Sequence, residues 1–466
     1  MHSLLTAVAP AAIPLHVVSR AGWPELQGKL QAEGRNFALA QGFSARPGQH
    51  LVLPDASGSI AAVLLGVEGR DARRRDPFAP GRLAALLPAG DYALRGEIDD
   101  PASAALAWLL QGYRFDRYRK PSLPVARLVV PEGVDAAELS AIAGSVMLAR
   151  DLINTPANDL GPAEIESAIR ELGRECDATV VSIVGDDLLA RNFPMIHAVG
   201  RASPRAPRLV DLVWGDASHP KVTLVGKGVA FDTGGLNLKP DASMLLMKKD
   251  MGGAASAIAA ARMIMLAGLP VRLRLLVPAV ENAVSGTAFR PGDVLQSRKG
   301  LSVEIGNTDA EGRLILADAL ALADEEEPEL LVDFATLTGA ARVALGPELP
   351  PCYTHDDGLA QEIMRIGMAV NDPVWRMPLW PPYDALLDSK IADVNHVSSG
   401  GMAGSVTAAL FLNRFVEKAR SYAHFDIYGW VPTAGPGRPV GGECQAARLV
   451  YALARQFYPA EAKRAG

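Results

Sequence analysis

The sequence predicts an α/β protein of two domains: a smaller N-terminal α/β domain and a larger C-terminal domain with a mixed, mostly parallel sheet covered by helices. The chain of 466 residues is longer than one ordinary core supports. Short apolar runs alternate with helical stretches along the chain, which is typical of α/β folds. A proline-punctuated stretch followed by a helical pattern indicates a boundary between two domains.

The N-terminal domain is predicted from a few short elements. Residues 51–53 and 61–65 are apolar runs of strand length, and residues 102–112 have a helical pattern. Residues 1–20 are apolar but lack the basic start of a signal peptide, and Pro10 and Pro14 interrupt them. We therefore expect a buried strand there rather than a signal peptide.

The domain boundary is predicted beside the prolines of residues 121–131, just before a helical pattern at residues 136–152. We assign residues 1–134 to the N-terminal α/β domain and residues 135–466 to the second domain. Residues 135–153 are the expected connecting helix.

The second domain shows a repeated alternation of strands and helices. Buried strands are predicted at residues 179–184, 209–213, 222–225, 273–277 and 330–334. Intervening helices are predicted at residues 254–266 and 315–323. In such sheets the reactive groups tend to lie on loops at the carboxyl ends of the strands, so we expect the catalytic or binding residues on those loops.

The composition argues against several classes of partner. The chain is 49% hydrophobic and 21% charged with a net charge of -6, which gives no basic footprint for nucleic acid. No stretch stays apolar for the ~20 residues that a membrane-spanning helix needs. Cys176, Cys352 and Cys444 are too far apart in sequence for a thiolate metal site or redox motif. We expect a reducing compartment, the cytoplasm, and neither nucleic acid nor membrane as partner.

One candidate site is the glycine-rich loop after the strand at residues 222–225. The loop carries Lys227 and Asp232, but it lacks the residue order of a phosphate-binding loop or a dinucleotide-binding motif. Its glycines allow the backbone to approach another group closely. Taken alone, the loop also fits an ordinary tight turn.

Three more carboxylates lie on loops of the same domain. Asp250 precedes two glycines and an alanine-rich helix, where it would also serve as a helix cap. Asp309 and Glu311 are separated by one residue at another helix start, where negative charge also suits the helix dipole. If these carboxylates and Asp232 converge, their mutual repulsion implies divalent cations. Spacing alone does not show that convergence.

The segment Asn307-Thr-Asp-Ala-Glu-Gly-Arg-Leu314 resembles the signature of the leucyl aminopeptidase family, the M17-type cytosol aminopeptidases. The glycine-rich loop, Lys239-Pro240 and Asp250-Met-Gly-Gly-Ala254 follow in the family's order and spacing. The resemblance extends over residues 152–425. The first ~130 residues resemble the family only in size and α/β character.

The resemblance implies a role for each matched residue. One metal would be bound by Lys227, Asp232, Asp250 and Glu311, and the second by Asp232, Asp309 and Glu311. Two further catalytic positions are implied at Lys239 and Arg313, the latter holding a bicarbonate ion. The pocket for the first side chain of the substrate is implied at Met247, Thr336 and Gly339.

The implied function is a two-metal aminopeptidase that removes apolar residues such as Leu and Met from the free N-termini of peptides. The resemblance also implies a homohexamer. Oxygen ligands with one amine suit Zn²⁺, Mn²⁺, Co²⁺ or Mg²⁺. The residues alone leave two alternatives open: a two-metal phosphatase or nuclease, and a non-catalytic binding protein that keeps the fold.

Overall fold

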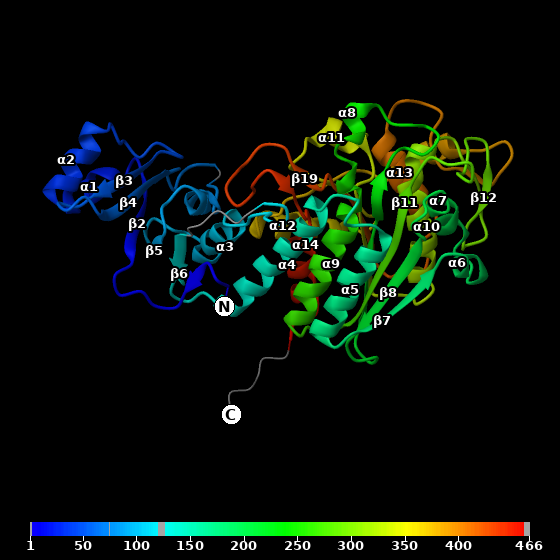
Figure 1. Ribbon diagram of the computed structural model, residues 1–466, viewed down its shortest axis with the longest axis horizontal. Helices are drawn as coiled ribbons and strands as arrows, with labels where there is room; N and C mark the ends of the chain where they lie inside the picture. The colour runs from blue at the N-terminus through cyan, green and yellow to red at the C-terminus, as the bar shows by residue number, and fades with distance from the viewer. Residues whose placement is uncertain (1, 74, 120–125, 461–466) are drawn as a thin grey trace. The chain divides into compact units, whose positions relative to one another are not determined.

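The computed structural model describes residues 2–73, 75–119 and 126–460 (Figure 1). Contacts divide the chain into one unit of Met1–Met147 with Thr433–Val440 and a second of Leu148–Pro432 with Gly441–Gly466. The division falls inside helix α4 (Ala136–Asn154), whereas the sequence places the boundary just before this helix. Residues 121–125 of the proline-punctuated stretch lie outside the described residues.

The first unit contains a six-stranded sheet in the order β1-β6-β5-β2-β4-β3. All described pairings in it are parallel except that of β3 with β4. Strand β2 lies within the first 20 residues, where a strand is predicted, and it pairs with β4 and β5. The strands are β1 (Leu5–Thr6), β2 (Ile13–Ser19), β3 (His50–Pro54), β4 (Ile60–Val67), β5 (Gly90–Gly96) and β6 (Ala126–Val129). The helices are α1 (Trp23–Lys29), α2 (Ala32–Ala40) and α3 (Pro101–Gln111).

The second unit contains a mixed sheet in the order β16-β15-β18-β14-β9-β11-β8-β7, with β10 paired to β11. The central strands β18, β14, β9 and β11 run parallel, and β8 and β7 are added antiparallel at one end. Both units are therefore α/β, as predicted. The strands are β7 (Thr179–Val184), β8 (Arg208–Trp214), β9 (Lys221–Gly226), β10 (Gly228–Asp232), β11 (Arg272–Asn282), β14 (Leu330–Ala335), β15 (Pro351–Tyr353), β16 (Trp375–Arg376) and β18 (Tyr422–Asp426).

Each of the five strands predicted for this domain lies within an observed strand. The prediction that all five are buried is wrong for β7, which forms the end of the sheet and leaves Val181 56% exposed. An edge strand has a neighbour on one side only, so its side chains are less covered. No helix among the described ranges is long and apolar enough to cross a bilayer.

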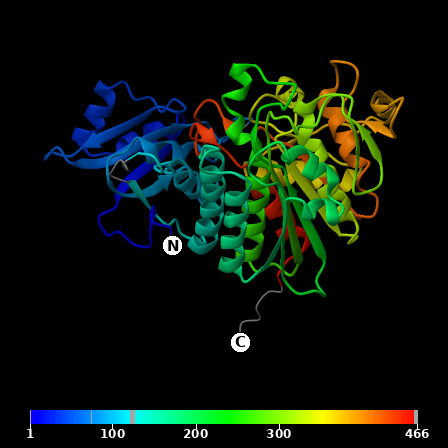
Figure 2. The same ribbon diagram turned by 45° about the vertical axis from the view of Figure 1, so that its right-hand side comes forward.

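Helices cover the sheet of the second unit (Figure 2). Helix α9 (Gly252–Leu266) packs on β9 and β14 together with α5 (Pro162–Cys176) and α14 (Ala447–Phe457). Helix α10 (Glu311–Asp324) packs on β9 and β11 with α7 (Pro194–Gly200) and α13 (Gly404–Asn413). Helices α9 and α10 are the two predicted from the sequence. Both begin at the carboxyl ends of the central parallel strands.

Glycines allow α9 to begin directly on the sheet. A Cβ at Gly226 would lie 2.6 Å from the Cα of Ala254. A Cβ at Gly253 would lie 3.0 Å from the Cα of Ala335 and closer still to the carbonyl oxygen of Phe334. The backbone of β14 cannot yield to a side chain there, because it pairs with strands on both sides.

We predict that Gly253→Ala destabilises the protein by about 1–3 kcal/mol, because the added methyl forces α9 away from β14. Urea unfolding would measure the change in the free energy of unfolding. Gly286→Ala is the matched control, since a Cβ there meets no atom within 4 Å. Equal stabilities for the two variants would contradict the prediction.

Candidate functional site

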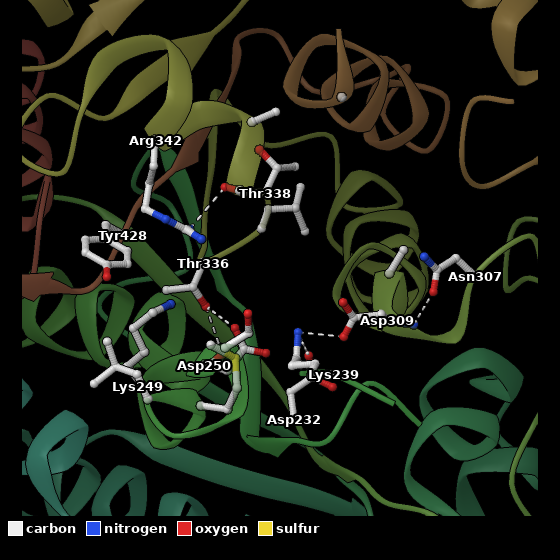
Figure 3. Close-up of a pocket in the computed structure, with 18 of the residues that line it drawn as sticks. Asp232, Lys239, Lys249, Asp250, Asn307, Asp309, Thr336, Thr338, Arg342 and Tyr428 are labelled. Carbon is white, nitrogen blue, oxygen red and sulfur yellow. Dashed lines mark hydrogen bonds and ion pairs between the residues drawn. The ribbon is translucent and has the colours of Figure 1, made fainter. Parts of the chain in front are cut away.

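The residues singled out in the sequence gather at one cavity of about 610 Å³ in the second unit (Figure 3). All of them except Glu311 line the cavity, and Glu311 lies 1% exposed beneath it. Most of them come from the ends of β9 and β10, from the 3-10 helices η2 (Met247–Met251) and η3 (Thr308–Ala310), and from the starts of α10 and α11 (Gly339–Leu345). Lys239 lies in the loop after β10, and Thr336 directly follows β14. The cavity therefore lies at the carboxyl ends of the strands, where the reactive groups of such a sheet are expected.

Asp232 ends β10 and is held in place by its neighbours. Its Oδ1 accepts hydrogen bonds from Asn282 Nδ2 and from the backbone nitrogen of Gly234, each at 2.8 Å. Asn282 also donates to the carbonyl of Thr308 at 3.1 Å, which links the end of β11 to η3. The other oxygen of Asp232, Oδ2, takes no part in these bonds and faces the ammonium of Lys239.

Three carboxylates form a compact cluster. Oxygen atoms of Asp232, Asp309 and Glu311 all lie within 4.8 Å of one another. Two lysines lie among them: Lys227 Nζ is 3.1 Å from Glu311 Oε1, and Lys239 Nζ is 2.9 Å from Asp232 Oδ2 and 2.6 Å from Asp309 Oδ1. Within the described part of the chain, Glu311 Oε1 and Asp309 Oδ1 have these ion pairs but accept no hydrogen bond.

The cluster strongly perturbs its acids. Burial and the charge of Asp232 raise the pKa of Glu311 well above its ordinary value. Burial and the charge of Asp250 raise the pKa of Asp232 to about 6. Burial lowers the pKa of Lys227, but the charges of Asp250 and Glu311 outweigh it and leave the pKa raised. The raised pKa values of Glu311 and Asp232 indicate that the two lysines do not fully compensate the negative charge of the cluster, which suits the binding of further cations.

Asp250 lies on η2, between the lysines and Thr336. Its Oδ2 accepts a hydrogen bond from Lys227 Nζ at 2.8 Å, and its Oδ1 accepts one from Thr336 Oγ1 at 2.8 Å. Burial raises the pKa of Asp250, but the charges of Lys227 and Lys249 outweigh burial and lower it overall. Asp250 is thus ionised and oriented by two donors.

Arg313 extends from α10 and is buried. Its Nη1 donates to the carbonyl of His396 at 2.8 Å, and its Nε has no hydrogen-bond partner among the described residues. Burial lowers the pKa of Arg313 to about 10, which still leaves it charged at neutral pH. An unpaired buried donor of this kind is suited to an anion.

Among the cavity-lining residues that were not singled out in the sequence are two cations, Lys249 and Arg342, and the aromatic residue Tyr428. Burial lowers the pKa of Lys249 to about 8. Lys249 is 3% exposed and follows Lys248, which is partly exposed. Two adjacent lysines in a short segment do not indicate which one is buried, so no sequence signal separates them.

Most of the chain is similar to known cytosol aminopeptidases. The model of the cytosol aminopeptidase family, catalytic domain, matches residues 147–450. The model of the M17 aminopeptidase N-terminal domain matches residues 13–131, so the N-terminal resemblance extends beyond the size and α/β character expected above. A Stenotrophomonas maltophilia protein named "Probable cytosol aminopeptidase" is 44% identical over 442 residues, covering 88% of this chain and 89% of that protein.

Two solved structures are similar over nearly the whole chain. The cytosol aminopeptidase from Coxiella burnetii has a TM-score of 0.93 and 46% identity, and the match covers 98% of this chain and 99% of that one. The bottromycin maturation enzyme BotP in complex with Mn has a TM-score of 0.85 and 34% identity, covering 96% of this chain and 99% of that one.

The environment of His396 predicts an acid-sensitive contribution to stability. Burial, together with the charge of Arg313, lowers the pKa of His396 to about 3, from 6.5 in an unperturbed histidine. Unfolding therefore takes up a proton between these values. The stability that the neutral imidazole contributes is present above pH 6.5 and is lost as the pH falls toward 3, by about 1.4 kcal/mol per pH unit.

We predict that His396→Gln loses less stability between pH 7 and pH 4.5 than the unsubstituted protein, although its stability at pH 7 is lower. The free energy of unfolding from urea titrations at several pH values would measure this slope. His50→Gln, at an exposed position, controls for the loss of an imidazole. Parallel slopes for His396→Gln and the unsubstituted protein would contradict the prediction.

Proposed function

Because this chain belongs to the cytosol aminopeptidase (M17) family and is an aminopeptidase acting on peptides, we propose that it is a two-metal enzyme. The observation that carries the proposal is the cluster of three carboxylate oxygens within 4.8 Å of one another. Two buried oxygens of this cluster, Glu311 Oε1 and Asp309 Oδ1, pair with lysine ammonium groups, and an oxygen that pairs with an ammonium can pair with a metal cation in its place. The structure named for BotP contains Mn, which supports a divalent metal of this type.

We assign the ligands as the family pattern implies. Lys227, Asp232, Asp250 and Glu311 would hold one ion, and Asp232, Asp309 and Glu311 the other. The donor set fits, because oxygen ligands with one amine suit Zn²⁺, Mn²⁺, Co²⁺ or Mg²⁺. A lysine must lose its proton to act as a ligand, and a neighbouring dication favours that loss. When bound, two such ions supply a water of lowered pKa and polarise the carbonyl of the substrate.

The other residues act on the substrate through their own charges. Lys239 stands at the cavity wall, where its ammonium would stabilise the negative charge that develops on the carbonyl oxygen. Asp250, oriented by Thr336, would accept a hydrogen bond from the free α-amine, which restricts cleavage to N-terminal residues. Arg313 would hold a bicarbonate ion as the base that takes a proton, since none of the described residues that line the cavity is a histidine.

We place the first side chain of the substrate against Met247, Thr336 and Gly339, which line the same cavity. A methionine and the methyl group of threonine favour apolar residues such as Leu and Met. Apolar contacts discriminate by only about 1–3 kcal/mol per methylene, so several residues would be accepted. We also propose a cytoplasmic location and a homohexamer, as the family resemblance implies.

We predict that chelator-treated protein loses activity and regains it on addition of Mn²⁺ or Zn²⁺. Leucine p-nitroanilide is the substrate for this test. N-acetyl-leucine p-nitroanilide, which lacks the free amine, is the control and should remain uncleaved. Full activity after removal of metal, verified by elemental analysis, would rule out the two-metal proposal.

We predict that Lys239→Met lowers kcat by about 10²–10³-fold and changes KM much less, because the ammonium acts mainly in the transition state. Steady-state kinetics with leucine p-nitroanilide would separate the two parameters. Lys248→Met removes a lysine that does not line the cavity and serves as the control. A change in KM alone would mean that Lys239 only binds substrate.

A further inference from the structure

Two cations lie in the cavity wall beside the residues proposed to hold the first side chain. Lys249 and Arg342 both line the cavity, on the same side as Thr336 (Figure 3). Lys249 is 3% exposed, and Arg342 is partly buried. They flank Tyr428: Lys249 Nζ lies 5.0 Å from the centre of the ring and Arg342 Cζ lies 4.6 Å from it.

Neither cation forms an ion pair with a carboxylate of a described residue. Among the described residues, Lys249 Nζ forms no hydrogen bond or ion pair. It faces the ring of Tyr428, and the charge of Asp250 acts on it from beyond ion-pair distance. Arg342 donates one hydrogen bond, to the carbonyl of Thr338 at 3.2 Å, and forms no ion pair with a described residue. The nearby carboxylate of Asp250 already accepts hydrogen bonds from Lys227 and Thr336.

An unpaired buried ammonium is costly, and two like charges around one ring add repulsion. A tyrosine face offsets only part of that cost. The neighbouring Lys248 shows the usual alternative: it is partly exposed, donates to the carbonyl of Asn154 at 2.7 Å and does not line the cavity. An anion that enters the cavity would supply the negative partner that Lys249 and Arg342 lack.

The guanidinium of Arg342 is also open toward the cavity. Position 339 carries no side chain, and a Cβ there would lie 3.6 Å from Arg342 Nη2. Glycine therefore leaves the space over the guanidinium free for a substrate atom. Because Gly339 belongs to the wall assigned to the first side chain, the group that reaches Arg342 and Lys249 is that side chain.

We propose that the pocket for the first side chain is an anion-binding subsite in which Lys249 and Arg342 bind the carboxylate of an N-terminal glutamate or aspartate. This inference rests on the proposed aminopeptidase function and adds a substrate class to it. Uncharged Leu and Met lie against Met247 and the aliphatic stems of the two cations. N-terminal Lys and Arg are disfavoured, since their charge would meet Lys249 and Arg342.

The test compares isosteric substrates on the metal-loaded enzyme: the aminomethylcoumarin amides of Glu and Gln, with those of Leu and Lys alongside. These amides carry no carboxylate except the glutamate side chain. We expect kcat/KM for Glu to exceed that for Gln by about 10–100-fold, the effect of a charge-assisted hydrogen bond. Lys249→Met should lower this ratio severalfold, and Arg342 would account for the discrimination that remains.

Lys248→Met is the matched control and should keep the Glu-to-Gln ratio of the unsubstituted enzyme. Lys249→Met should fold, because an apolar chain of similar length replaces an unpaired buried charge. Arg342→Met is the second variant. It replaces a partly exposed residue and should also lower the Glu-to-Gln ratio. A ratio of 1 or less in the unsubstituted enzyme, or one unchanged in both variants, would overturn the proposal.

Failure of the proposed function has a different signature, the absence of Leu cleavage at any metal concentration. Calorimetric binding of L-glutamate and L-glutamine to the metal-free protein then provides the test. Tighter binding of glutamate by about tenfold or more, lost in Lys249→Met, supports the subsite. Equal affinities overturn it. If only substrates with a free C-terminal carboxylate gain from Lys249, the cations bind that end instead and the proposal is also wrong.

Discussion

The structure of the second unit depends on charge compensation in a buried cluster of acids. Asp232, Asp250 and Glu311 are each no more than 3% exposed, and they lie near one another in ion pairs with Lys227 and Lys239. Removing any one partner would leave an uncompensated charge out of water, which costs far more than the pair contributes. The elements that supply these groups must therefore end at one point. The close approach of α9 at Gly226 and Gly253 meets that requirement.

Much of the fold was predictable because its central strands are short, apolar and separated by clear helical patterns. Helix α9, observed at Gly252–Leu266, begins within two residues of its predicted start. The edge position of β7 was not predictable, because an apolar run of strand length does not reveal whether it has one neighbour or two. The grouping of Thr433–Val440 with the first unit also has no local signal, since it depends on contacts distant in sequence.

The site was predictable to a different degree. The sequence identified the carboxylates and lysines through a family resemblance, whereas their spacing left turns and helix caps as equal explanations. The structure brings together Asp232, Asp309 and Glu311, from β10, η3 and α10. The cationic wall was missed because Arg342 and Tyr428 are 86 residues apart and stand in no motif, although they meet across 4.6 Å. Contacts of this range follow from the strand order, which a single sequence does not reveal.

The carboxylates lie on one side of the cavity, with Lys227 and Lys239 among them, whereas the other side carries cations alone. Under the proposed function, this separation would connect the specificity of the enzyme with its chemistry. Asp232 and Asp309 stand on one side, Lys249 and Arg342 on the other, and Asp250 lies between them (Figure 3). A peptide that begins with glutamate matches this arrangement, with its amine toward the acids and its side chain toward the cations. Reversal of that orientation would place like charges together at both ends. Under the proposed function, the separation of charge that suits the acidic side to metal ions would therefore also orient the substrate.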